Sequence, residues 1–159
     1  MSKILNILTD PNPILRKEST PLDAEKLKES ELQEFCRDLI LTMKEKDGVG
    51  LAAPQVGKNI RIIVVTVDNK PVCLINPQIT KRSWARAQDE EGCLSVPGKY
   101  GQVERNKKVN CSYLTPGGKK KQIRAQDLSA RIIQHEIDHL DGILFIDKAK
   151  SLRFPGSGS

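Results

Sequence analysis

The stretch QHEIDHLDG (residues 134–142) contains the chain's only two histidines, His135 and His139, and Glu136 directly follows the first of them. On an α-helix, residues four apart lie one above the other on the same face. Two imidazoles placed in this way can chelate one metal ion, and the adjacent carboxylate can act as a base. The H-E-x-x-H spacing therefore predicts a helix with a catalytic metal, and it leaves a third protein ligand to be found.

The competing interpretation is a pair of surface histidines on a polar helix face. Leu128, Ile132, His135 and His139 share one face of the predicted helix, so the histidines continue an apolar surface and should be partly buried. Buried neutral imidazoles need polar partners, and a metal ion supplies a partner for both at once. We therefore favour the metal.

The third ligand is not the one used by two common groups of peptidases. No glutamate follows Glu136, which excludes the downstream glutamate of thermolysin-like enzymes. The position at which metzincins carry a third histidine is Phe145. The remaining candidates are Asp138, Asp141, Asp147, an upstream carboxylate and a cysteine.

Among the four cysteines, Cys93 is set apart by its surroundings. It lies in DEEGCLSVPG, where the glycines and the proline indicate a small irregular loop that lets a thiolate approach a ligand closely. Cys36, Cys73 and Cys111 fall within predicted regular elements that have core-like neighbours. The residues alone favour Cys93 and leave the carboxylates open.

The elements around these residues predict an α+β fold rather than alternating βαβ units. Apolar residues at three- and four-residue steps predict an amphipathic helix from a capping box at Ser30–Gln33 to about Gly48. Runs 61–67 and 71–76 predict strands joined by a tight turn, and runs 103–115 and 119–126 predict a hairpin. A second helix is expected to begin with Asp127 as its N-cap and to end before Gly142.

Length and composition predict one catalytic domain over residues 1–150 and a flexible tail over 151–159. No apolar run is long enough for a membrane span, and we expect no membrane partner. The absence of a C-x-x-C pair and of a signal peptide indicates reduced thiols in a cytosol-like compartment.

The formal net charge of +6 includes basic clusters at 105–108 and 119–121. Solvated strand edges are one interpretation, and weak attraction to a polyanion such as ribosomal RNA is the other. Aromatic residues are few, which argues against stacking platforms for single-stranded nucleic acid and against sequence-specific nucleic-acid binding.

Three segments in register resemble the peptide deformylase family: GVGLAAPQVG (48–57), EGCLSVPG (91–98) and QHEIDHLDG (134–142). The lead-in DPNPILR is similar to the N-terminal part of that family, and order and spacing match from about residue 4 to residue 148. The resemblance implies antiparallel β-sheets packed around a central helix that carries H-E-x-x-H, with an N-terminal amphipathic helix.

The resemblance also implies that Cys93, His135 and His139 bind one divalent metal ion, with water in the open fourth position. Fe(II) is the expected native metal, and Zn, Ni or Co are expected substitutes. The implied reaction removes the N-formyl group from the N-terminal formylmethionine of newly synthesised polypeptides. Metal-bound water attacks the formyl carbon, with Glu136 as general acid and base.

Two groups are implied as oxyanion donors, namely the side-chain amide of Gln55 and the backbone N–H of Leu94. Glu91 is expected to pair with Arg105 and to rigidify the loop that carries Cys93. The alternative is that these two residues are surface charges with little effect.

Helix geometry predicts the pocket for the methionine side chain. Leu128 and Ile132 precede His135 by seven and three residues, so they should lie beside the metal, together with Val49 and Gly50 of the glycine-rich segment. Arg131 lies at the edge of this face, where it either extends to solvent or contacts the peptide backbone.

The expected partners are N-formylmethionyl nascent peptides, with weak ribosome association as a further alternative, and the expected state is a monomer. The expected location is the cytoplasm, or an organellar matrix or stroma after removal of a transit peptide, or a phage-infected cell. Two competing functions are a general metallopeptidase and a metal-stabilised RNA-binding module. Glu136 beside an open metal position argues against the second.

Overall fold

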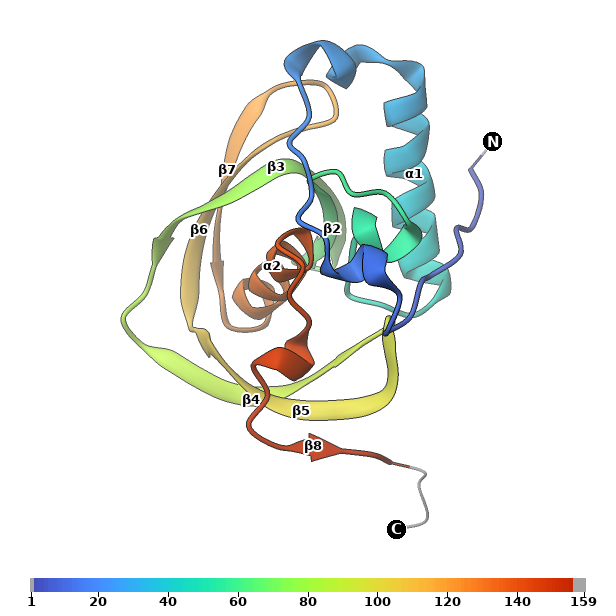
Figure 1. Cartoon of the computed structure of the whole chain (residues 1–159). Coiled ribbons are helices and arrows are strands. Elements are labelled where there is room, and N and C mark those ends of the chain that lie inside the picture. Colours follow the sequence, from blue (N-terminus) through green and yellow to red (C-terminus); the bar gives the residue numbers. More distant parts are fainter. Residues whose placement is uncertain (1, 156–159) are drawn as a thin grey trace.

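Two antiparallel sheets enclose the second helix in the computed structural model, which describes residues 2–155 (Figure 1). The larger sheet has the order β1 (Gly50–Ala52), β2 (Ile62–Val67), β3 (Lys70–Arg82), β6 (Lys108–Leu114) and β7 (Lys120–Gln126). The smaller sheet consists of β4 (Arg86–Cys93), β5 (Val96–Asn106) and β8 (Leu152–Arg153). The predicted α+β class with antiparallel sheets around a central helix is confirmed.

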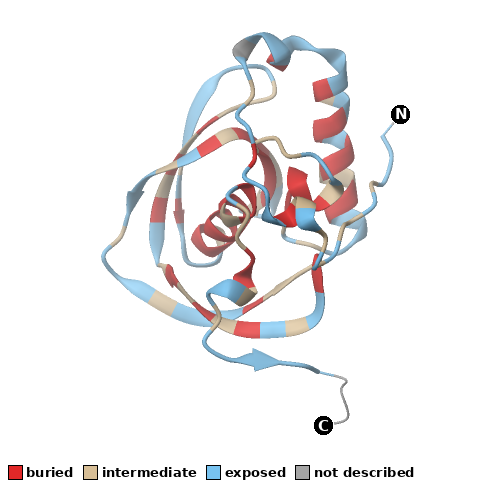
Figure 2. Cartoon of the chain, in the orientation of Figure 1, coloured by how far each residue is buried: buried red, intermediate tan, exposed pale blue. Residues whose placement is uncertain are grey.

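The helices lie on both sides of the larger sheet. They are α1 (Ser30–Glu45) and α2 (Asp127–Leu140), with the short 3-10 helices η1 (Pro13–Arg16), η2 (Ala24–Lys28), η3 (Ala53–Val56) and η4 (Phe145–Asp147). Figure 2 shows α1 buried along one stripe, whereas α2 is buried along most of its length. No helix among residues 2–155 is long and apolar enough to cross a membrane.

Strand β2 explains why both helices can pack on one sheet. Successive side chains of a strand point to opposite faces. Ile62 and Val64 join the cluster beneath α1, whereas Ile63 and Val65 join the cluster beneath α2. All four side chains are fully buried, so residues 62–65 form an unbroken apolar run with a core on each side.

The predicted amphipathic helix, the first hairpin and the end of the second helix are confirmed. Of the second predicted hairpin, residues 108–114 and 120–126 pair as β6 and β7, whereas residues 103–106 belong to β5 of the smaller sheet, so the start of that run is wrong. Asp68 and Asn69, both at positive φ, form the tight turn between β2 and β3. Residues 115–119 connect β6 to β7, and Gly142, at φ 75°, follows the C-cap of α2. A positive φ is accessible to glycine without steric cost, which explains its place there.

Both predicted N-caps are wrong. The N-cap of α1 is Glu29 and that of α2 is Gln126, and neither side chain forms a capping hydrogen bond. Ser30 and Asp127 are instead the first residues of their helices, with Asp127 at φ 54°. At the start of α2 a backbone contact takes the place of a side-chain cap, because the N–H of Asp127 donates to the carbonyl of Lys107.

The expected irregular loop around Cys93 is also wrong, because this segment is a β-hairpin. Strand β4 pairs with β5 from Arg86–Asn106 to Gly92–Tyr100, and after a bulge Cys93 pairs with Val96. The tight turn between the strands is Leu94–Ser95. Strand β4 contains mainly polar and charged residues. It therefore lacks the alternation of apolar and polar residues that indicates a strand in a sequence.

The segment predicted as a flexible tail begins with an ordered strand. In β8, Leu152 and Arg153 pair with Gly101 and Tyr100 of β5, so this part of the tail prediction is wrong. Residues 156–159 of the expected tail lie outside the described part of the chain.

We predict that Ile133→Ala lowers the free energy of unfolding by about 2–5 kcal/mol, because Ile133 is fully buried between α2 and the larger sheet. The matched control is Leu128→Ala, on the same helix, since Leu128 is 63% exposed. This control should change the stability by less than about 0.5 kcal/mol. Urea unfolding at constant metal loading measures both values, and equal losses would contradict the assigned core.

Candidate metal centre and active site

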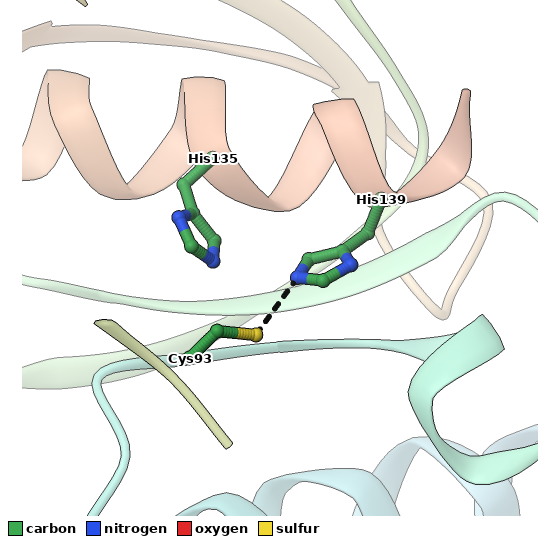
Figure 3. A group of neighbouring side chains, drawn as sticks. All are labelled: Cys93, His135 and His139. Carbon is green, nitrogen blue, oxygen red and sulfur yellow. Dashed lines mark hydrogen bonds between the residues drawn. The ribbon is translucent and has the colours of Figure 1, made fainter. Parts of the chain in front are cut away.

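The side chains of Cys93, His135 and His139 converge at one point between the two sheets (Figure 3). Cys93 ends β4, and both histidines project from α2. One ligand atom from each residue lies within 4.8 Å of the other two, and Cys93 Sγ is 3.3 Å from His139 Nε2. No other group of three or more potential metal ligands occurs within residues 2–155.

This donor set fits a tetrahedral divalent cation. Bond lengths of about 2.3 Å to sulfur and about 2.1 Å to nitrogen place two ligands of one tetrahedral ion about 3.6 Å apart. The separation of 3.3 Å between Cys93 and His139 is close to that value. Three protein ligands leave one position open, which is the arrangement of catalytic rather than structural sites.

The carboxylates that the sequence left open as a third ligand are paired with cations instead. Asp138 is bound by Arg105 and Lys148. Asp141 lies 3.0 Å from Arg61, and Asp147 binds Arg16. The geometry therefore favours Cys93 over all three aspartates.

A bulge in the β4–β5 hairpin brings Cys93 to the histidines. The bulge falls between Gly92 and Cys93, and the ring of Tyr100 packs against the Gly92 backbone. A Cβ atom at position 92 would lie 2.7 Å from that ring, so only glycine lets the ring pack this closely against the backbone.

His135 is oriented by Glu91. Its Nδ1 lies 2.8 Å from Glu91 Oε1, and an ionised carboxylate can only accept, so Nδ1 carries the proton. This leaves Nε2 of the neutral ring available for a metal. Burial raises the pKa of Glu91, but hydrogen bonds from His135 and Arg105 outweigh it and hold the pKa well below its usual range.

Three further hydrogen bonds saturate the Glu91 carboxylate. Arg105 donates through Nε and Nη2, each at a distance of 2.9 Å, and Arg131 donates through Nη1 at 2.6 Å. Glu91 and Arg105 are both buried, so the pair is not the surface ion pair considered as the alternative. Arg105 also binds Asp138 over 2.6 Å and thereby joins β5 to α2.

Arg131 has a different environment from the one predicted. Its side chain is buried, so the alternative in which it extends to solvent is wrong. Besides Glu91, the guanidinium donates to the carbonyls of Val103 and Ala87 over 2.8 and 2.9 Å. Arg131 lines the cavity beside the metal centre, but its polar atoms tie α2 to β4 and β5.

Glu136 is buried beside the group of Cys93, His135 and His139, and its Oε1 atom has no hydrogen-bond partner within residues 2–155. Burial, assisted by the negative charge of Glu91, raises the pKa of Glu136 to about 7. A carboxyl group with this pKa can exchange a proton at neutral pH. A Cβ atom at position 50 would lie 2.5 Å from Glu136 Oε2, so Gly50 makes room for the carboxylate.

The two histidines differ in their affinity for protons. Burial, together with the charge of His135, lowers the pKa of His139 well below its usual value, which favours the neutral, metal-binding form. Burial also opposes charge on His135, but Glu136, Cys93 and Glu91 outweigh it and raise the pKa of that ring. A divalent cation would compete with this proton.

Gln55 points its amide N–H groups at the metal centre. Its Oε1 accepts from the backbone N–H of Ala52 over 2.9 Å, which fixes the orientation of the amide. Its Nε2 then lies 3.1 Å from Ser95 Oγ and 3.5 Å from Cys93 Sγ. The sequence did not single out Ser95, because a lone buried serine in a turn carries no pattern of its own.

A cavity of about 510 Å³ opens beside the ligands. Every residue predicted for the substrate pocket lines it, namely Val49, Gly50, Leu128, Arg131 and Ile132. Gln55, Leu94 and Glu136 line the same cavity. Val96 and Tyr100 of β5 also line the cavity. The sequence did not predict their position, because it did not predict the β4–β5 hairpin.

We predict that Cys93→Ser removes most of the bound metal, because a hydroxyl is a poor replacement for a thiolate ligand. Cys111→Ser is the matched control, since Cys111 is buried in β6 outside the ligand group. Metal content per folded protein after desalting is the measurement. Full metal content in the Cys93 variant would contradict the assigned ligand set.

Comparisons with known proteins agree with this geometry. The family model of polypeptide deformylase matches residues 4–154. A peptide deformylase of Alkaliphilus metalliredigens is 48% identical over 142 residues, which cover 89% of this chain and 94% of the relative. One of Dictyoglomus thermophilum is 46% identical over 138 residues, or 87% of this chain and 88% of the relative.

A solved structure shows the same similarity in three dimensions. The Met-Ala-Ser-bound class I type b peptide deformylase of Acinetobacter baumannii superimposes with a TM-score of 0.90 at 38% identity. The match covers 93% of this chain and 99% of that chain. The chain therefore belongs to the polypeptide deformylase family.

Proposed function

We propose that this deformylase, which removes the formyl group from nascent peptides, does so at a metal centre held by Cys93, His135 and His139. The observation that carries the proposal is the convergence of these ligands beside the buried, unpartnered carboxylate of Glu136. When bound, a divalent cation lowers the pKa of a coordinated water and polarises the formyl carbonyl. We infer Fe(II) as the native metal, with Zn, Ni or Co as substitutes.

Glu136 moves the proton in this proposal. Its carboxylate takes a proton from the attacking water and passes it to the amine that leaves as the C–N bond breaks. A carboxylate suits both transfers, because it can be deprotonated before attack and protonated afterwards. Gly50 keeps the reacting carboxylate accessible, since no side chain stands in front of it.

Gln55 and Leu94 stabilise the negative charge that develops on the formyl oxygen. The Gln55 amide is already fixed by Ala52 and Ser95, so it needs no reorganisation during the reaction. Leu94 follows Cys93 in the turn of the hairpin and lines the same cavity, and its backbone N–H is the second proposed donor.

The substrate pocket accepts the methionine side chain. Val49, Leu128 and Ile132 supply apolar walls, and a flexible thioether adapts well to such a surface. The relative of Acinetobacter baumannii is bound to Met-Ala-Ser, a peptide that begins with methionine, which supports this choice of substrate.

We infer one catalytic domain that acts as a monomer on N-formylmethionyl nascent peptides in the cytoplasm, or in an organelle of bacterial type. Weak association with the ribosome fits the positive net charge of +6.

We predict that Glu136→Gln lowers kcat for formyl-Met-Ala-Ser by about 10²–10⁴-fold, because the amide cannot carry the proton. Metal content should be unchanged, since Glu136 is not a proposed ligand. The assay measures formate release by anaerobically purified protein. No formate release from wild-type protein that is folded and metal-loaded would reject the proposed function itself.

We predict that Arg131→Leu weakens metal binding by about 10–100-fold, because Glu91 loses a donor and holds His135 less firmly. Arg124→Leu is the matched control, since Arg124 is an exposed residue of β7. Competition with a chelator measures the metal affinity, and Arg131→Lys should restore part of it. An unchanged affinity in Arg131→Leu would show that Arg131 does not support the ligands.

A further inference from the structure

Trp84, the only tryptophan of the chain, lies in the connection between β3 and β4 with 99% of its surface exposed. This connection lies at the left edge of the molecule in Figure 1. Burial of a tryptophan removes about 150–250 Å² of surface from water, and the fold leaves this gain unused. The whole ring of this indole is open to a partner.

The loop that carries Trp84 is held in one conformation by its neighbours. The backbone N–H of Ser83 donates to the carbonyl of Lys108 (2.9 Å), and the N–H of Lys108 donates to Ser83 Oγ (3.0 Å). The Ser83 hydroxyl in turn donates to the carbonyl of Ala85 (2.7 Å). The N–H of Lys107 donates to Ala85, and the side chain of Asn106 donates to the carbonyl of Ser83. The indole is therefore presented on an ordered turn.

Five exposed cations surround this turn. We call residues 81–86 and 107–108 the Trp84 surface, and its cations are Lys81, Arg82, Arg86, Lys107 and Lys108. These two segments contain no acidic residue. Within residues 2–155, none of the five cations forms an ion pair.

The nearby acids leave this charge largely uncompensated. Asp138 is bound by Arg105 and Lys148, and Glu104 lies 3.6 Å from Lys150. Asp141 also lines a cavity with Arg82 and Arg86, and it is paired with Arg61. Asp127, whose backbone N–H bonds to the carbonyl of Lys107, is exposed. Because the three acids that share this cavity are each paired with a cation outside the Trp84 surface, its five cations leave it positive.

We propose that the Trp84 surface binds single-stranded RNA, with a base stacked on the indole and the backbone phosphates on the flanking cations. Stacking on an aromatic ring within a basic surface is the usual chemistry of such binding. Trp84 and Ala85 are the only apolar residues of the surface, too few for a membrane anchor or for the apolar centre of a protein interface.

RNA is the favoured polyanion because the enzyme acts on nascent peptides, which are made on RNA-rich particles. The low aromatic content argued against a stacking platform, but composition does not show that the one tryptophan is fully exposed. The inference is independent of the metal chemistry, since RNA binding can be measured without turnover.

The Trp84 surface and the metal centre lie at opposite ends of β4. Seven residue steps separate Arg86 from Cys93, and at about 3.3 Å per residue this is roughly 23 Å along the strand. None of the residues of the Trp84 surface lines the cavity beside the metal ligands. A bound RNA strand would therefore leave the entrance for the peptide open.

The single tryptophan makes the test direct, because intrinsic fluorescence reports on Trp84 alone. We expect an oligoadenylate of about 12 nucleotides, within the usual range of site sizes, to quench the fluorescence of the metal-loaded protein in a saturable way. The association constant should fall as the salt concentration rises. The Lys and Arg side chains of the protein release counterions from the phosphates, and added salt opposes this release.

Variants identify the surface when binding is followed by the anisotropy of labelled oligoadenylate. Trp84→Ala should weaken binding by about 5- to 150-fold, and Trp84→Phe should retain most of it. Arg82→Ala with Arg86→Ala should weaken binding and flatten the salt dependence. Lys120→Ala with Lys121→Ala removes the same charge from exposed positions of β7 and should have a much smaller effect. Formate release should be unchanged in Trp84→Ala.

Four outcomes would overturn the proposal. The first is no quenching by oligoadenylate, and the second is an equal affinity of Trp84→Ala and wild type. The third is an equal loss of oligoadenylate affinity in the double arginine and double lysine variants. The fourth is Trp84-dependent binding to phosphatidylserine vesicles without binding to RNA. The third outcome would indicate unspecific attraction to charge, and the fourth would indicate a membrane surface.

Discussion

The carboxylate of Glu91 is the interaction on which the rest of this site depends. It lies on β4, two residues before Cys93, and accepts four hydrogen bonds from Arg105, Arg131 and His135. One of these donors is on β5 and two are on α2. The same carboxylate therefore fixes the strand that ends in one ligand and the ring that provides another.

A buried charge of this kind is stable only when all its partners are present. Removing a carboxylate from water is costly, and the attraction to buried cations offsets that cost only with good geometry. Here both oxygens of Glu91 are bonded twice, and Arg105 is further bound by Asp138. Glu136, only one residue from His135, has no hydrogen-bond partner at Oε1 within residues 2–155, and this contrast separates a structural carboxylate from the one that we propose as the proton carrier.

The sequence predicted the parts of the site that depend on local periodicity. His135 and His139 were placed together because residues four apart share a helix face, and Leu128 and Ile132 follow from the same geometry. Cys93 could be favoured from its neighbours but not assigned, since only the pairing of β4 with β5 brings it to the helix. Its role as a ligand came from the family resemblance.

The environment of Arg131 could not be predicted, because it depends on which backbone carbonyls pass near α2. Those of Val103 and Ala87 belong to two strands, and β4 had no apolar pattern to reveal it. The N-caps were wrong for a similar reason. A serine or aspartate near a helix start resembles a cap in sequence, whereas the contacts that end the preceding segment are long-range.

The position of Cys93 has a consequence for the thermal stability of the fold. The sulfur belongs to the smaller sheet, whereas both histidines belong to the helix packed on the larger sheet. A cation that joined them would close a loop of more than forty residues between Cys93 and His139, in the manner of a reversible cross-link. Because such a cation binds the folded chain better than the unfolded one, its occupancy would raise the melting temperature as well as enable the reaction.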